Sequence, residues 1–211
     1  DGVRVETRLL QRVGAAPDDW VFVAYRWTDD GRDAVAAPAG AENVRGTAHD
    51  VPAADRCVGC HGGRASRVLG FSAVQLSHTE GRSETTLRGL ADLGLLRAPV
   101  PEVDLPGDAL DQEALGYLHA NCGHCHNSLR PAAQGARCYD PRNELDFALR
   151  AAAITSRSQA PAYQTAVDDV LEPGAPDESR MLTLMARRGT QLHMPPLATE
   201  RVDEAGLATL R

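Results

Sequence analysis

The most informative stretch of this 211-residue chain is Cys122-Gly123-His124-Cys125-His126, and its spacing is repeated at Cys57-Val58-Gly59-Cys60-His61. Both stretches have the pattern C-x-x-C-H. Two thiols three residues apart on a helical turn can reach the two vinyl groups along one haem edge, and the following histidine is then held over the iron. The spacing therefore predicts two covalently attached c-type haems, with His61 and His126 as proximal ligands.

Other chemistry that uses paired cysteines fits this pattern less well. Residues 122–125 also form the tetrapeptide of a disulfide isomerase, but that enzyme needs a thioredoxin-like βαβ context. A zinc ribbon pairs its C-x-x-C units ~15–20 residues apart, whereas Cys60 and Cys122 are much further apart. A disulfide framework gives no reason for a histidine after both pairs. Cys138 lies outside both motifs and is left as an odd thiol, either buried and inert or paired elsewhere.

A haem iron has two axial positions, and Met194 is the best candidate for the second position on the haem of residues 122–126. It lies in His193-Met194-Pro195-Pro196-Leu197, where two prolines stiffen the backbone and present one side chain rigidly. Met181 and Met185 are four residues apart on an expected helix and read as core residues. His193 is the alternative ligand.

The first haem has no methionine available between residues 1 and 120, so its second ligand is expected to be a histidine. His49 is favoured because Val51-Pro52 makes a stiff entry to the first motif. His78, which follows an apolar stretch after that motif, is the alternative. His119 lies one turn before Cys122 and is expected to pack at the haem edge rather than to bind iron.

The pattern along the chain predicts a mainly α fold with two cytochrome c-like modules. Residues 1–48 are expected to form a small β hairpin or sheet, because residues 20–27 are rich in β-branched and aromatic side chains. Residues 49–98 would form the first haem module, 99–107 a proline-rich linker, and 108–211 the second haem domain. Helices are expected at the following ranges: 85–96, 108–122 with Asp108 or Asp111 as cap, 176–188 and 203–211.

The composition of the chain argues against two kinds of partner, nucleic acid and the interior of a membrane. The net charge of −7 argues against nucleic acid, which is bound by a surplus of Lys and Arg. No apolar run approaches the ~18–20 residues that a membrane span needs. Only 4% of the residues are aromatic, which is little for a full-sized core and agrees with an interior filled by prosthetic groups.

Longer stretches around these motifs resemble a family of bacterial exported di-haem cytochromes c. The resemblance rests on four stretches, which are Tyr117-Leu118-His119-Ala120-Asn121-Cys122-Gly123-His124-Cys125-His126-Asn127, His49-Asp50-Val51-Pro52, Leu69-Gly70-Phe71-Ser72-Ala73-Val74-Gln75-Leu76, and Pro173-Gly174-Ala175-Pro176 with Ser179 leading to Met194-Pro195-Pro196. It implies electron transfer in the periplasm or beyond, and a thioether ligand at Met194.

The expected function is therefore electron transfer between redox protein partners rather than enzymatic catalysis. A di-haem peroxidase-type enzyme is the main alternative, and it would need an iron with one open face for peroxide. A third hypothesis is a haem-bearing subunit docked on a larger dehydrogenase or respiratory complex.

Overall fold

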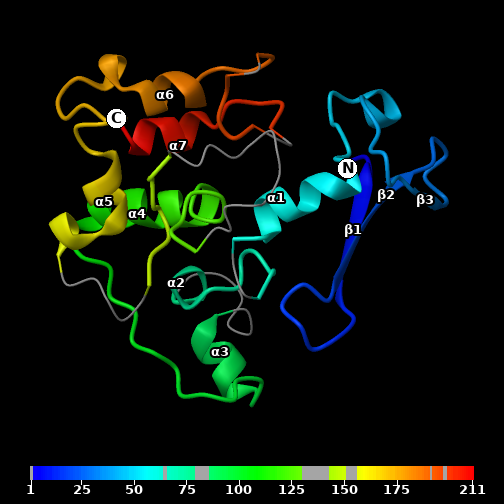
Figure 1. The fold of residues 1–211 in the computed structure, drawn as a ribbon, viewed down its shortest axis with the longest axis horizontal. Coiled ribbons are helices and arrows are strands. Elements are labelled where there is room, and N and C mark those ends of the chain that lie inside the picture. Colours follow the sequence, from blue (N-terminus) through cyan, green and yellow to red (C-terminus); the bar gives the residue numbers. More distant parts are fainter. Residues whose placement is uncertain are drawn as a thin grey trace.

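A computed structural model gives the fold of the chain and describes residues 2–63, 66–78, 86–129, 143–150, 156–190, 192–196 and 199–211. Its N-terminal part is an antiparallel sheet of three strands, β1 (Glu6–Arg12), β2 (Trp20–Trp27) and β3 (Ala34–Ala36), in that order (Figure 1). β1 and β2 form the expected hairpin, in which Glu6 lies opposite Arg26 and Arg12 opposite Trp20. β3 adds an edge that the sequence pattern did not predict.

The helices are short. Those of α type in the described part are α1 (Cys57–His61), α2 (Ala73–Leu76), α3 (Leu87–Asp92), α4 (Ala109–Asn121), α5 (Pro161–Ala166), α6 (Arg180–Met185) and α7 (Glu204–Thr209). Single 3-10 turns occur at Val44–Gly46, Ala54–Arg56, Arg157–Gln159 and Pro176–Glu178.

The expectation of a mainly α chain is wrong. The structure is 32% helical with 12% strand, and most of the described residues lie in turns and irregular segments. Glycine and proline explain the short helices. α3 ends at Asp92 rather than continuing to residue 96, because Gly94 adopts a left-handed φ of 67° that stops a helix. The expected helix over 176–188 is split into a 3-10 turn and α6.

α4 is the longest helix in the described part, and it carries the second cysteine motif at its end. Asp108 accepts hydrogen bonds from the backbone N–H groups of Leu110 and Asp111, both at 3.0 Å. The Asp111 carboxylate accepts in return from the Asp108 backbone N–H at 3.2 Å, which completes a capping box. Both predicted cap residues therefore take part, and Cys122 follows as the C-terminal cap.

Two hydrophobic clusters lie in different parts of the chain. A small one joins Ala24, Ala37, Val44 and Val51 beneath the sheet. The larger one is built by α4, α5, α6, α7 and the segment around Phe147. In Figure 1, α1 lies between the sheet and the end of α4. Within the described residues, no helix has the length and apolar character needed to cross a bilayer.

Candidate functional site

The second C-x-x-C-H motif forms one tight turn at the end of α4. The backbone N–H of His126 donates to the carbonyl of Cys122 at 2.8 Å, and the N–H of Cys125 donates to the same carbonyl at 3.1 Å. The Cys122 N–H itself still donates to Leu118 at 2.9 Å, as in the helix. Because of this turn, the two sulfurs and the imidazole of the five-residue motif lie on one side of the chain.

That side faces a cavity of about 560 Å³. Its volume lies within the ~300–1,000 Å³ typical of pockets that hold small molecules and cofactors. Both cysteines and His126 of the motif line it. Met194, which lies far from the motif in the sequence, lines it as well. His124 of the motif and the two prolines after Met194 also line it. The remaining lining residues lie in α4, in the segment that carries Phe147, and in α6 with the segment before it; they are Tyr117, Asn121, Asn143, Glu144, Leu145, Phe147, Asp169, Val170, Arg180, Met181, Leu184 and Met185.

The predicted ligand Met194 is held in place by hydrogen bonds of its backbone N–H and carbonyl. Its N–H donates to the carbonyl of Leu184 in α6 at 3.1 Å, and Arg188 Nη1 donates to its carbonyl at 3.4 Å. Met181 and Met185 are buried in the core, as predicted, and also border the cavity. Met194 therefore differs from them in lying on a loop rather than on a packed helix face.

His193, the alternative ligand, is turned away from the cavity wall. Its Nδ1 is bonded to the carbonyl of Thr190, and it is not among the residues that line the cavity. Phe147, which the sequence analysis did not single out, stands edge-on to His126 with ring centroids 5.6 Å apart and an interplanar angle of 73°. Its backbone N–H donates to the carbonyl of His126 at 2.9 Å. Phe147 therefore restricts the rotation of the His126 ring.

The first motif forms α1, and its histidine has a defined orientation. His61 Nδ1 lies 2.7 Å from the carbonyl oxygen of Arg67, which can only accept, so Nδ1 carries the proton. This leaves Nε2 with its lone pair, as in a metal-binding histidine whose other nitrogen is held by a carbonyl. Arg67 is itself buried with a left-handed φ of 54° and is ion-paired with Asp18 in the hairpin turn. The β1–β2 turn thus fixes the carbonyl that orients His61.

The space beside the first motif is much smaller than that beside the second. It measures about 80 Å³ and is lined by the motif, by Pro52 and Arg56, and by residues of β1 and β2. Phe22 of β2 lies on His61, with ring centroids 5.4 Å apart. Two thiols and an imidazole could hold a haem, but this space is much smaller than the ~300–1,000 Å³ typical of pockets that hold cofactors.

Neither candidate for the second ligand of the first iron lines that space. His49 Nε2 lies 3.2 Å from Glu6 Oε1, and its Nδ1 lies 3.8 Å from Glu200 Oε1. His78 is exposed at the end of the segment that follows α2. The assignment of His49 stays a prediction, and His78 stays its alternative.

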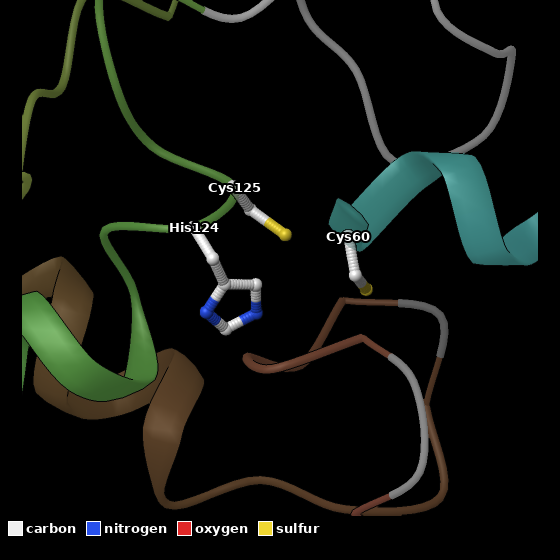
Figure 2. A group of neighbouring side chains, drawn as sticks. All are labelled: Cys60, His124 and Cys125. Atoms are coloured by element: carbon white, nitrogen blue, oxygen red, sulfur yellow. The ribbon is translucent and has the colours of Figure 1, made fainter. Parts of the chain in front are cut away.

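The two motifs meet at their second cysteines, which sequence spacing could not indicate. Cys60 of α1 lies opposite Cys125 and His124 on the turn after α4, and the sulfur of Cys125 points towards the end of α1 (Figure 2). The ligand atoms of these three residues lie within 4.8 Å of one another. His124 was missed as a site residue, although a second histidine inside C-x-x-C-H is itself a signal.

The surroundings shift the pKa values of three of the motif thiols, Cys57, Cys60 and Cys122. A hydrogen bond from Cys125 lowers the pKa of Cys60 well below its usual range, and His124 acts in the same direction against the effect of burial. Burial raises the pKa of Cys122 to about 12. Burial also raises the pKa of Cys57. Cys138 lies outside the described residues.

Comparison with known proteins does not assign the chain to a family. No protein-family model matches it, and neither the curated proteins nor the solved structures contain a match.

Proposed function

We propose that this protein is a di-haem c-type cytochrome that transfers electrons between redox proteins outside the cytoplasm. The observation that carries the proposal is the cavity of about 560 Å³. The second C-x-x-C-H turn and Met194 both line it. Two thiols, an imidazole and a thioether are the attachment groups and axial ligands of a c-type haem. The second motif supports this reading more strongly than the first.

The residues around the cavity have separable roles in this proposal. Cys122 and Cys125 attach the haem, His126 and Met194 bind its iron, and Phe147 holds the His126 ring. The haem supplies a reversible one-electron couple. Apolar side chains of α6 and Leu145 would contact the group, and the thioether ligand would raise its reduction potential.

For the first haem, Cys57 and Cys60 would be the attachment residues and His61 the proximal ligand, with Nε2 presented by the bond from Nδ1 to Arg67. His49 is the proposed second ligand. Attachment of haem through thioethers takes place on the outer side of the bacterial inner membrane, as the resembling family implies, so the protein is proposed to be periplasmic or exported.

A di-haem peroxidase-type enzyme is the second candidate function. It is favoured by one observation: among the described residues lining the space beside the first motif, only the motif itself offers a sulfur or imidazole ligand. A five-coordinate, high-spin first haem in the resting or half-reduced protein would support the enzyme over the electron carrier.

The experiment that tests the proposal measures covalent haem. The protein made in a host that attaches c-type haem should retain two haems per chain after denaturation, and only Cys138 should then react with a thiol reagent. Haem that extracts into acidic organic solvent, or three or more reactive thiols, would refute the proposal. Optical redox titration of the same sample would separate the two potentials and report both spin states.

A further inference from the structure

The contact between the two motifs brings three soft ligands together. Cys60 Sγ, Cys125 Sγ and a ring nitrogen of His124 all lie within 4.8 Å of one another, and all three residues are half-buried. They come from opposite sides of the contact, Cys60 from α1 and the other two from the turn after α4 (Figure 2). A site made of these three would therefore join the two halves of the chain.

The backbone at this contact is held closely enough to preserve the cluster. A Cβ added to Gly63 would lie 2.6 Å from the carbonyl oxygen of His124 and 2.7 Å from Asn127 Nδ2, so the chain after α1 fits against the second motif only with glycine. Asn127 Nδ2 also donates to the carbonyls of Gly123 and His124, at 3.0 and 3.1 Å. Cys125 Sγ approaches the carbonyl of Gly59 at 3.7 Å. The cluster thus rests on several contacts.

Two thiolates and one imidazole form a donor set that zinc binds. Zn–S bonds of ~2.3 Å and Zn–N bonds of ~2.0 Å in a tetrahedron place the ligand atoms about 3.5–3.8 Å apart. The present separations are all within 4.8 Å, which exceeds these values by at most about 1.3 Å. Three protein ligands leave the fourth position for water, and soft sulfur ligands favour Zn²⁺ over Mg²⁺ or Ca²⁺.

We propose that the chain without haem binds one Zn²⁺ through Cys60, His124 and Cys125. Zn²⁺ binds both sulfurs as thiolates, so a sulfur that still carries its proton releases it to water on binding, and a water molecule completes the coordination. A second part rests on the proposed function: attachment of haem adds the S–H bond of each cysteine across a vinyl group, the sulfur bonding to one carbon and the proton to the other. The resulting thioethers at Cys60 and Cys125 no longer bind Zn²⁺ as thiolates. Zinc and haem therefore compete for the same two sulfurs.

The test uses the 211-residue chain made without haem attachment, with its thiols reduced, and Co²⁺ as the probe. One equivalent of Co²⁺ should give the visible bands of a tetrahedral ion and a sulfur-to-cobalt charge-transfer band, and Zn²⁺ should displace it. Cys60→Ser, Cys125→Ser and His124→Ala should each weaken binding at least tenfold. Cys57→Ser and Cys122→Ser are matched controls, because they alter the same two motifs outside the cluster, and they should bind as the unaltered chain does.

Two results would overturn the zinc site. One is the lack of a tetrahedral cobalt spectrum in the unaltered chain. The other is an equal loss of affinity in the Cys57→Ser and Cys122→Ser variants, which would indicate ordinary C-x-x-C chelation. X-ray absorption of the zinc-loaded unaltered chain needs no variant, and it should find two sulfur ligands and one imidazole per zinc; another donor set would also overturn the site.

The competition is tested separately on haem-loaded protein. That protein should show no tetrahedral cobalt site, and a site retained there would overturn the shared-sulfur part of the proposal. If no haem attaches at all, the proposed function fails, whereas the cobalt titration of the haem-free chain still decides the zinc site. The two failures are therefore distinguishable.

Discussion

The backbone N–H of Leu149 donates a hydrogen bond of 2.9 Å to Nδ1 of His119, a side chain that is only 1% exposed. Because Nδ1 accepts, Nε2 carries the proton, and it donates to Ser72 Oγ at 2.9 Å. One buried imidazole thus connects α4, the segment that carries Phe147, and the start of α2. The ring joins the two haem modules proposed for the chain, and it is not placed to bind iron.

Replacing His119 with Ala should lower the free energy of unfolding by about 3 kcal/mol. The change leaves a cavity, and it removes the hydrogen-bond partner of the Leu149 N–H and of the Ser72 hydroxyl. Together such losses in a core cost about 2–5 kcal/mol. Urea unfolding followed by circular dichroism measures the change. Ser72→Ala, which removes one of these contacts and the cap on α2, should cost less, about 1 kcal/mol. An effect of His119→Ala no larger than that of Ser72→Ala would contradict the central role of the ring.

The close fit of the chain after α1 against the second motif predicts different effects for alanine at Gly63 and at Gly59. Gly63→Ala should destabilise the protein by about 1–3 kcal/mol, because its Cβ would meet the backbone of His124, which cannot move without disturbing the motif. Gly59→Ala is the matched control, since nothing lies within 4 Å of its Cβ and it lies inside α1. It should be neutral or stabilising by up to about 1 kcal/mol. Thermal unfolding of both variants checks the difference.

Local sequence patterns could predict the elements that carry the site, but not how they meet. The C-x-x-C-H spacing, the hairpin over β1 and β2, and the cap of α4 all depend on residues within one turn or one hairpin of each other. The meeting of Cys60 with Cys125 depends on how two segments pack, and no short pattern encodes that. Met194 could be singled out because proline constrains its neighbours locally, and the structure places it on the cavity wall.

The prediction of a mainly α fold was wrong for a physical reason that α3 illustrates. Its leucines have helical spacing, yet the left-handed Gly94 ends the helix soon after Asp92. Hydrophobic spacing records which side of a segment is buried, whereas glycine and proline decide how long the helix lasts. Arg67 was missed because its position depends on the ion pair with Asp18, and Phe147 because its role depends on the contact with His126; both partners are distant in sequence.

Met194→Ala should abolish the weak far-red sulfur-to-iron charge-transfer band and lower one of the two reduction potentials. The thioether favours ferrous iron, and its loss admits water or a stronger donor. Met185→Leu is the control, because it removes a neighbouring thioether while keeping the volume of a buried core residue. Optical titration of both variants gives the result. A band that survives in Met194→Ala and disappears in Met185→Leu would move the ligand to α6.

The hydrogen bond between Tyr117 and Asp203 predicts a pH-dependent contribution to stability. Tyr117 donates to Asp203 Oδ2 at 3.1 Å, and burial together with this acceptor raises the pKa of Tyr117 to about 12. A raised phenol pKa adds stability that is fully present below the unfolded value of about 10 and is lost as the pH rises through 12. Tyr117→Phe should therefore cost about 1 kcal/mol at pH 8, with the difference from the unaltered protein shrinking between pH 10 and 12. Tyr163→Phe, which removes the hydroxyl of an exposed tyrosine on α5, is the control for the substitution itself.

The last prediction is that the first haem has two histidine ligands, His61 and His49, and the lower potential of the pair. No methionine lies in the first half of the chain, and imidazole stabilises ferric iron better than a thioether does. His49 is favoured over the exposed His78 because its segment is anchored: Val51 exchanges backbone hydrogen bonds with Ala41 at 2.8 and 3.0 Å, and Pro52 lines the space beside the first motif.

His49 could bind iron through either ring nitrogen. Binding through Nε2 would break its contact with Glu6, whereas binding through Nδ1 would break its contact with Glu200 and keep the one with Glu6. A carboxylate on the other ring nitrogen is a common partner of a metal-binding histidine. His49→Ala should convert the low-potential haem to a high-spin form that binds carbon monoxide when reduced, whereas His78→Ala should leave it low-spin. The reverse result assigns His78. If neither variant changes the spin state, the two-histidine assignment is wrong, and the peroxidase-type alternative, which needs an open iron, is the better account of the first haem.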